Sequence, residues 1–168
     1  MKHTIYIAVM LSVFVLLGTS CSSQKSVSKD KNSVIFVENT KKGNKKLYSV
    51  VEDWLGTPYK YGGQSKKGTD CSGLIVEIYK SVYGKQLYRN SHEIYEKNCK
   101  PIKKKDLKEG DLVFFIISKS GKRINHVGLY LKDNKFVHST TKKGVIITDL
   151  SENYYERYFY RAGRVKSN

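Results

Sequence analysis

The sequence has few prolines, few acidic residues and no long apolar segment. Its 168 residues include 2 prolines and 3 cysteines, and 15 Asp and Glu stand against 31 Lys and Arg. The low proline content, 13 glycines and the lack of a low-complexity tract exclude collagen-like and wholly disordered chains. With 39% hydrophobic residues, the chain can form one folded domain with a buried core.

The shortage of acidic residues leaves a formal net charge of +16. This charge predicts attraction to a polyanion, and nucleic acid, anionic cell wall and lipid head groups all qualify. The compartment decides among them, and the N-terminus indicates the compartment.

The apolar run from Ile5 to Leu17 follows Lys2 and is too short to cross a bilayer as a helix, which takes about 20 residues. It is typical of a secretory signal peptide, so we expect residues 1–20 to be removed. Cys21 follows directly and resembles the acylated cysteine of a bacterial lipobox, with an unlipidated signal peptide as the alternative. We therefore expect an exported, membrane-anchored lipoprotein. Ser22 favours the outer membrane facing the periplasm, and this compartment excludes nucleic acid as a partner.

Residues 21–46 are rich in lysine, serine and asparagine, and we interpret them as a lipidated cysteine followed by a basic flexible tether. The folded domain is predicted over 47–168. Apolar residues at helical spacing predict helices from Leu47 to Leu55 and from Cys71 to Tyr83, and Asp70 is the expected N-cap of the second.

The remaining pattern predicts one short helix, Ser91 to Asn98, followed by strands. Alternating apolar residues and turn-forming segments predict these strands at Asp111–Ile117, Ile124–Leu131, Lys135–Thr140, Val145–Leu150 and Tyr158–Val165. Helices first and an antiparallel meander afterwards indicate the α+β class, with N-terminal helices packed on a sheet of about five strands.

Cys71 is the candidate nucleophile. With Cys21 assigned to lipid, Cys71 and Cys99 could form a disulfide. Against this pairing, Cys71 lies in the predicted first turn of a helix, where unpaired backbone N–H groups and the helix dipole favour a thiolate.

The base must come from 4 histidines. His3 is lost with the signal peptide, and His92 lies in a polar stretch typical of a surface histidine. His126 and His138 lie on adjacent predicted strands joined by a turn, where one imidazole can orient the other. This predicts a triad in which Cys71 attacks, His126 carries the proton and His138 fixes the tautomer of His126. Without the cysteine, two strand histidines would fit a metal site or satisfied polar residues equally well, and a zinc site would need Cys71 as its third ligand.

Several motifs occur in a fixed order: WLGTPYKYGG at 54–63, DCSG at 70–73, GDLVFF at 110–115, NHVGLY at 125–130 and FVHS at 136–139. Together they resemble the NlpC-type, papain-like cell-wall peptidase family, and within it the small murein endopeptidase lipoproteins of the Spr kind. The resemblance covers about 47–165.

The resemblance implies a circularly permuted papain-like fold and a cysteine endopeptidase that hydrolyses amide bonds in peptidoglycan stem peptides. The bond is either D-alanyl to diaminopimelate across a cross-link or γ-D-glutamyl to a diamino acid within one stem. No metal or other cofactor is implied. Cys71, His126 and His138 match the positions of the family's triad.

Three further positions match the family's substrate site. Tyr59 corresponds to a tyrosine near the nucleophile that helps to hold the oxyanion, although most of the 13 tyrosines must serve packing. Asp70 and Ser72 match positions that line the site, and an N-cap role for Asp70 is compatible with this.

The chain departs from the family pattern at 87–91, where LYRNS replaces a more usual LPRT or LPRS stretch, and at Tyr95, where glutamine is usual. Cys99 has no counterpart and is interpreted as a free, partly buried thiol. The alternatives to an enzyme are a catalytically inactive wall-binding module and an adhesion lipoprotein, and the complete triad weighs against both.

Overall fold

The computed structural model describes residues 43–117 and 121–167. The predicted signal peptide, Cys21 and the tether up to residue 42 therefore lie outside the described residues. None of the described helices is long and apolar enough to cross a membrane.

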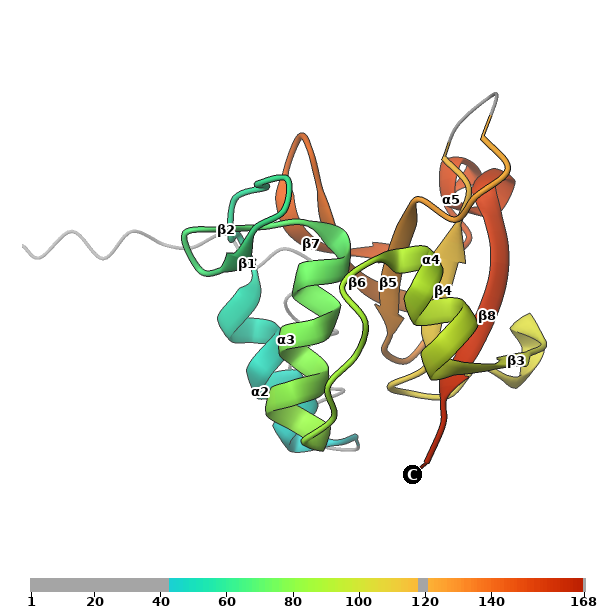
Figure 1. Cartoon of the computed structure of the whole chain (residues 1–168), viewed down its shortest axis with the longest axis horizontal. Coiled ribbons are helices and arrows are strands. Elements are labelled where there is room, and N and C mark those ends of the chain that lie inside the picture. The colour runs from blue at the N-terminus through green and yellow to red at the C-terminus, as the bar shows by residue number, and fades with distance from the viewer. Residues whose placement is uncertain (1–42, 118–120, 168) are drawn as a thin grey trace, which may run out of the picture.

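Two helices form one side of the molecule, α2 (Lys45–Trp54) and α3 (Cys71–Tyr83). The side chain of Asn44 caps α2 by accepting from the N–H of Leu47 at 3.1 Å. Asp70 caps α3 as predicted, because its Oδ1 accepts from the N–H of Gly73 at 2.7 Å. Both predicted helices are confirmed, and Figure 1 shows them side by side against the sheet.

The main sheet has six antiparallel strands in the order β3-β8-β4-β5-β6-β7. The strands are β3 (Cys99–Ile102), β4 (Leu112–Phe115), β5 (His126–Tyr130), β6 (Lys135–Thr140), β7 (Gly144–Asp149) and β8 (Phe159–Val165). The α+β class and the five predicted strand regions are confirmed.

Two details of the sheet differ from the expectation. β4 to β7 form a meander, but β8 returns to lie between β3 and β4. β3 was not predicted because it contains Pro101, which is tolerated here since β3 is an edge strand paired only with β8. Its existence depends on a partner more than 60 residues away in the chain, such as Val165 opposite Cys99.

Short elements connect the helices and the sheet. A small hairpin, β1 (Gln64–Ser65) with β2 (Gly68–Thr69), precedes α3. The predicted short helix is present as α4 (Ser91–Glu93) and the π-helical turn η1 (Ile94–Asn98). A 3-10 turn, η2 (Lys104–Asp106), and an unpredicted helix, α5 (Asn153–Tyr158), complete the described chain.

The two faces of the sheet are both buried, but by different elements. Strand residues facing α2 and α3 join the larger core, among them Leu112, Phe114, Val127, Leu129 and Val137. The alternate residues form a second core under Tyr155 of α5, made of Val113, Phe115, Phe136 and Leu150. Because successive side chains of a strand point to opposite faces, β4 and β6 contribute to both cores.

Candidate active site

Cys71 is the first residue of α3, beside the start of β5. Cys71 as a whole residue is partly exposed, and it forms no disulfide with Cys99, which is 3% exposed. Burial raises the pKa of the Cys71 thiol to about 11, although the backbone N–H groups of Val127 and Ser72 act in the opposite direction. The helix start is present as predicted, but burial outweighs it, so the resting thiol is neutral rather than a thiolate.

His126 and His138 form a hydrogen-bonded pair, with 2.8 Å between Nε2 of His126 and Nδ1 of His138. The β5–β6 register aligns Leu129 with Val137 and Tyr130 with Phe136. Continued along the strands, this register puts His138 opposite Gly128 and makes the two histidines diagonal neighbours on one face. The predicted contact between the imidazoles is thus present.

Gly128 leaves room for this diagonal arrangement. A Cβ atom at position 128 would overlap Cδ2 of Phe136, whose ring lies where that side chain would be. The Phe136 ring in turn packs against the imidazole of His138, with 4.5 Å between centroids. Glycine at this position therefore lets Phe136 support the histidine pair.

His138 is fully buried, and its imidazole contacts both a threonine hydroxyl and aromatic rings. Its Nε2 lies 3.0 Å from Oγ1 of Thr148, and the ring of Tyr155 meets it at 90° with 5.0 Å between centroids. Burial and the neighbouring His126 lower the pKa of His138 well below its ordinary value. The imidazole is therefore a neutral, fixed hydrogen-bond partner.

His126 is more open than its partner, since it lines a cavity together with Cys71. Burial lowers its pKa from the ordinary 6.5 to about 4, so it is neutral at physiological pH. Its Nε2 is occupied by His138, which leaves Nδ1 as the nitrogen that can take a proton from Cys71. A neutral thiol and a neutral imidazole thus share one cavity.

Two cavities meet at Cys71. The arginine-side cavity, about 510 Å³, is lined by Tyr59, Tyr61, Gly62, Asp70, Cys71, Ser72, Arg89, Asn90, Ser91, Ile124 and Asn125. The tyrosine-side cavity, about 240 Å³, is lined by Tyr59, Cys71, Ile117, Asn125, His126, Ser139, Thr140, Thr141, Tyr154 and Tyr155. Tyr59, Cys71 and Asn125 belong to both, so a substrate that fills both cavities passes over the thiol.

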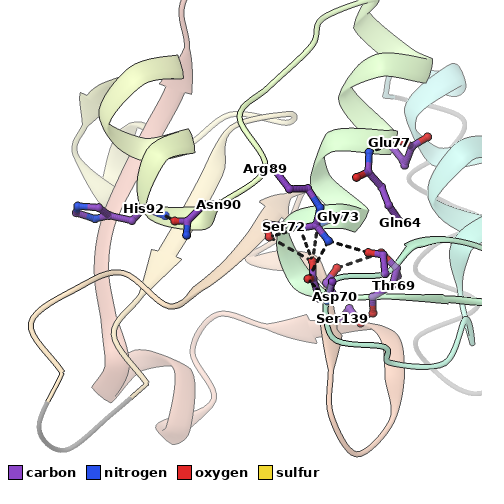
Figure 2. A network of polar contacts seen from close by, with 12 residues as sticks. Gln64, Thr69, Asp70, Ser72, Gly73, Glu77, Arg89, Asn90, His92 and Ser139 are labelled. Atoms are coloured by element: carbon purple, nitrogen blue, oxygen red, sulfur yellow. Dashed lines mark hydrogen bonds and ion pairs between the residues drawn. The ribbon is translucent and has the colours of Figure 1, made fainter.

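Asp70 and Ser72 are brought together by Arg89, which reaches them from the loop before α4 (Figure 2). Nη1 of Arg89 lies 2.8 Å from Oδ1 of Asp70, and Nη2 lies 2.9 Å from Oδ2. Nη1 also donates to Oγ of Ser72 at 2.8 Å. Burial alone would raise the pKa of Asp70, but Arg89 and the N–H groups of Gly73 and Gly62 hold it below its usual value.

Asp70 therefore has both of its predicted places, at the start of α3 and on the cavity wall. Tyr59 lines both cavities together with Cys71, and burial followed by the nearby Cys71 raises the pKa of its hydroxyl, which stays protonated. His92 is partly buried on α4 and points away from the Asp70 network (Figure 2). In 43–117 and 121–167, no group of three or more His, Cys, Asp or Glu side chains could hold a metal ion.

Several residues of the site were not predicted from the sequence. Arg89 was noted only as part of the LYRNS segment at 87–91. Its separation from Asp70 along the chain does not indicate that the two side chains form an ion pair. Thr148, Tyr154 and Tyr155 were not singled out, because α5 was not predicted and a threonine on a strand is unremarkable in sequence.

Comparison with known proteins gives consistent matches. Residues 56–164 match the model of the NlpC/P60 family. The chain is 40% identical over 123 residues to a probable endopeptidase NlpC homolog of Haemophilus influenzae, covering 73% of this chain and 63% of that protein. It is 39% identical over 122 residues to the murein DD-endopeptidase MepS/murein LD-carboxypeptidase of Escherichia coli K12, again covering 73% of this chain and 63% of the relative.

Among solved structures, an NlpC/P60 family protein of Bacillus cereus superposes with a TM-score of 0.66 at 31% identity, covering 73% of this chain and 40% of that one. The match thus spans less than two thirds of the length of each of these three proteins. Motif order, fold and sequence identity agree, and the chain belongs to the NlpC/P60 family.

Proposed function

We propose that this protein is a cysteine endopeptidase that hydrolyses amide bonds in the stem peptides of peptidoglycan. The observation that carries the proposal is the hydrogen-bonded His126–His138 pair, because His126 lines the same cavity as Cys71 at the start of α3. One relative is named a murein DD-endopeptidase, which supports the substrate class.

The reaction starts from the neutral pair. Sγ of Cys71 attacks the substrate carbonyl carbon while its proton passes to Nδ1 of His126, which carries no other described hydrogen bond. Charge develops on the carbonyl oxygen, where the backbone N–H of Cys71 and the hydroxyl of Tyr59 can donate to it. The low pKa of His126 means that proton transfer accompanies the attack rather than precedes it.

Collapse of this intermediate breaks the carbon–nitrogen bond. His126 gives its proton to the departing amine, and the acyl group stays on Cys71 as a thioester. Water then attacks the thioester carbon and passes a proton to His126, which returns it to the thiolate as the acid leaves. No electrons are exchanged with any other group, and the enzyme regains its starting state.

His138 and Thr148 fix the orientation of the base. In the arrangement that serves catalysis, Nε2–H of His126 donates to Nδ1 of His138, and Nε2–H of His138 donates to Oγ1 of Thr148. This chain of donors leaves Nδ1 of His126 unprotonated and able to act as base. It also disperses the positive charge that His126 carries during the reaction.

Digestion of purified peptidoglycan tests the proposal, with fragments identified by mass spectrometry. We expect new peptide fragments from the wild type and from Cys99→Ala, and none from Cys71→Ala or His126→Ala. The fragment masses distinguish D-alanyl-diaminopimelate cleavage from γ-D-glutamyl-diamino acid cleavage. Intact peptidoglycan that still binds the wild type would instead indicate a wall-binding module.

Chelation and alkylation separate this mechanism from a metal-dependent one. We expect hydrolysis to survive EDTA and to be lost when Cys71 is alkylated. Loss of activity in EDTA together with resistance to alkylation would contradict the thioester mechanism.

We also propose that the protein is exported and anchored through lipid on Cys21, at the outer membrane facing the periplasm. The support is the sequence pattern alone: the short apolar run from Ile5 to Leu17, the small residues after it and the cysteine that follows. Mass spectrometry of the mature N-terminus tests this, and a Cys21 without acyl chains would contradict it.

A further inference from the structure

We propose that the tyrosine-side cavity binds the amine-bearing half of the substrate, the half that leaves first, and that Tyr154 determines its selection. The inference rests on the proposed peptidase function and assigns a role to α5, which neither the motifs nor the triad explain. The ligand is a diamino acid with an aliphatic chain and a carboxylate, since the released amine belongs to a diamino acid in both of the bonds considered above.

The position of His126 sets the direction of the substrate. The departing nitrogen must receive its proton from His126, and this transfer requires hydrogen-bond distance. His126 lines the tyrosine-side cavity and is absent from the described lining of the arginine-side cavity. The acyl half of the substrate therefore extends past Asp70 and Arg89, and the amine half extends toward α5.

The two cavities differ in chemistry. The arginine-side cavity carries the Asp70–Arg89 ion pair. Apart from the catalytic Cys71 and His126, the described lining of the tyrosine-side cavity is aromatic rings, one isoleucine, one asparagine and hydroxyl groups, with no Asp, Glu, Lys or Arg. Such a surface suits the aliphatic part of an amino-acid chain rather than a second ionic group.

The hydroxyl groups of this cavity are not equivalent. Ser139 donates to the carbonyl oxygen of Thr69 at 2.8 Å, and Thr140 donates to that of Gly144 at 3.3 Å, so both serve the fold. Thr141 is exposed in the turn after β6 and is followed by the exposed Lys142 and Lys143. These lysines directly follow the lining residue Thr141 in the chain, and their positive charge suits the carboxylate of the substrate.

Tyr154 is a half-exposed ring that is held by its neighbours. It is 49% exposed and packs against Tyr155 at 5.1 Å and Tyr158 at 5.0 Å between ring centroids. Tyr155 in turn packs against Phe115, Phe136 and His138. A ring fixed in this way can contact a ligand at little entropic cost, which is the property expected of a specificity residue.

Two substrates with the same acyl half test the inference. One carries the full diamino-acid peptide as leaving group and the other carries only ammonia, as a primary amide. In Tyr154→Ala we expect kcat/KM to fall roughly 10-fold for the full substrate and to change less than about twofold for the amide. Tyr154→Phe keeps the ring and should behave as wild type.

Tyr160→Ala is the matched control, because Tyr160 is 40% exposed and lines neither cavity. An equal loss on both substrates in Tyr154→Ala would overturn the inference, since it would mean that Tyr154 acts through the triad. No loss on either substrate would overturn it as well.

Failure of the proposed function would look different, because the wild type would then cleave neither substrate. Calorimetry then tests the inference independently of catalysis. It measures how tightly the released diamino-acid peptide binds to the wild type and to Tyr154→Ala. Tighter binding to the wild type supports the subsite, and equal affinity overturns it.

Discussion

Nε2 of His126 lies 2.8 Å from Nδ1 of His138 although the two residues are diagonal, not opposite, on β5 and β6. The residue opposite His138 in this register is Gly128, and the absence of a side chain there admits the Phe136 ring that packs on His138. The geometry of the proposed base thus depends on a glycine and a phenylalanine that have no part in the proposed chemistry.

Gly128→Ala should therefore impair the enzyme without touching a reacting group. The added methyl group must displace the Phe136 ring, which we expect to cost about 1–3 kcal/mol in the free energy of unfolding and to lower kcat. Thermal unfolding and peptidoglycan turnover measure the two effects. Adding Phe136→Leu should recover part of the stability, and a fully active Gly128→Ala would contradict the assigned role.

Thr148→Val removes the oxygen that lies 3.0 Å from Nε2 of His138 and keeps the side-chain shape. The buried imidazole loses its partner, so we expect about 1–2 kcal/mol of destabilisation and a kcat lower by roughly 10-fold with KM little changed. Thr148→Ser keeps the hydroxyl and should retain most of kcat. An unchanged kcat in Thr148→Val would show that His138 needs no second partner.

The thiol of Cys71 should react slowly with iodoacetamide near neutral pH. Burial raises its pKa to about 11, so the alkylation rate should climb throughout pH 7 to 10 without the plateau of an ordinary thiol near 9. The measurement belongs in a Cys99→Ala background, because Cys99 is a second free thiol with its pKa raised to about 12. A plateau below pH 8 would instead indicate a preformed thiolate.

The low pKa of His126 predicts how kcat/KM and the free energy of unfolding change as the pH falls. With the folded pKa near 4 and the ordinary value at 6.5, the base stays neutral, and kcat/KM should hold between pH 7 and 5. The unfolded chain takes up the proton first, so this group's contribution to stability is complete above pH 6.5 and declines as pH falls from 6.5 to 4. Measurements of kcat/KM and of urea unfolding across this pH window check the two statements. His126→Asn is the control for the unfolding measurement.

Arg164 should matter for stability rather than catalysis. Its Nη2 lies 2.7 Å from Oδ2 of Asp111, whose side chain is 4% exposed, so Arg164→Met leaves a buried carboxylate without its charged partner. We expect a loss of about 2–3 kcal/mol, less than for a fully buried pair because the Arg164 side chain is 43% exposed. Arg161→Met on the same strand is the control, with an exposed side chain and an expected change below about 0.5 kcal/mol. Equal effects of the two substitutions would contradict this assignment.

Local signals in the sequence were sufficient for α3 and for the β5–β6 hairpin. Asp70 caps the helix as predicted, and Gly84 follows Tyr83, the predicted last residue, with φ 65°. Asp133 and Asn134 form the turn of the hairpin with φ 50° and 60°, a conformation that aspartate and asparagine tolerate better than most residues. Each of these features depends on residues that are close together in the chain, so a single sequence is enough to predict it.

The sequence by itself therefore determined the α+β class, the helix that carries Cys71 and the adjacent strands that carry the candidate histidines His126 and His138. Only the tertiary structure decided the diagonal register of the two histidines, the bond from Arg89 to Asp70 and the packing of Tyr155 on His138. The physical reason is that periodicity and capping depend on neighbours along the chain, whereas these contacts depend on how strands align and how α5 packs on the finished sheet.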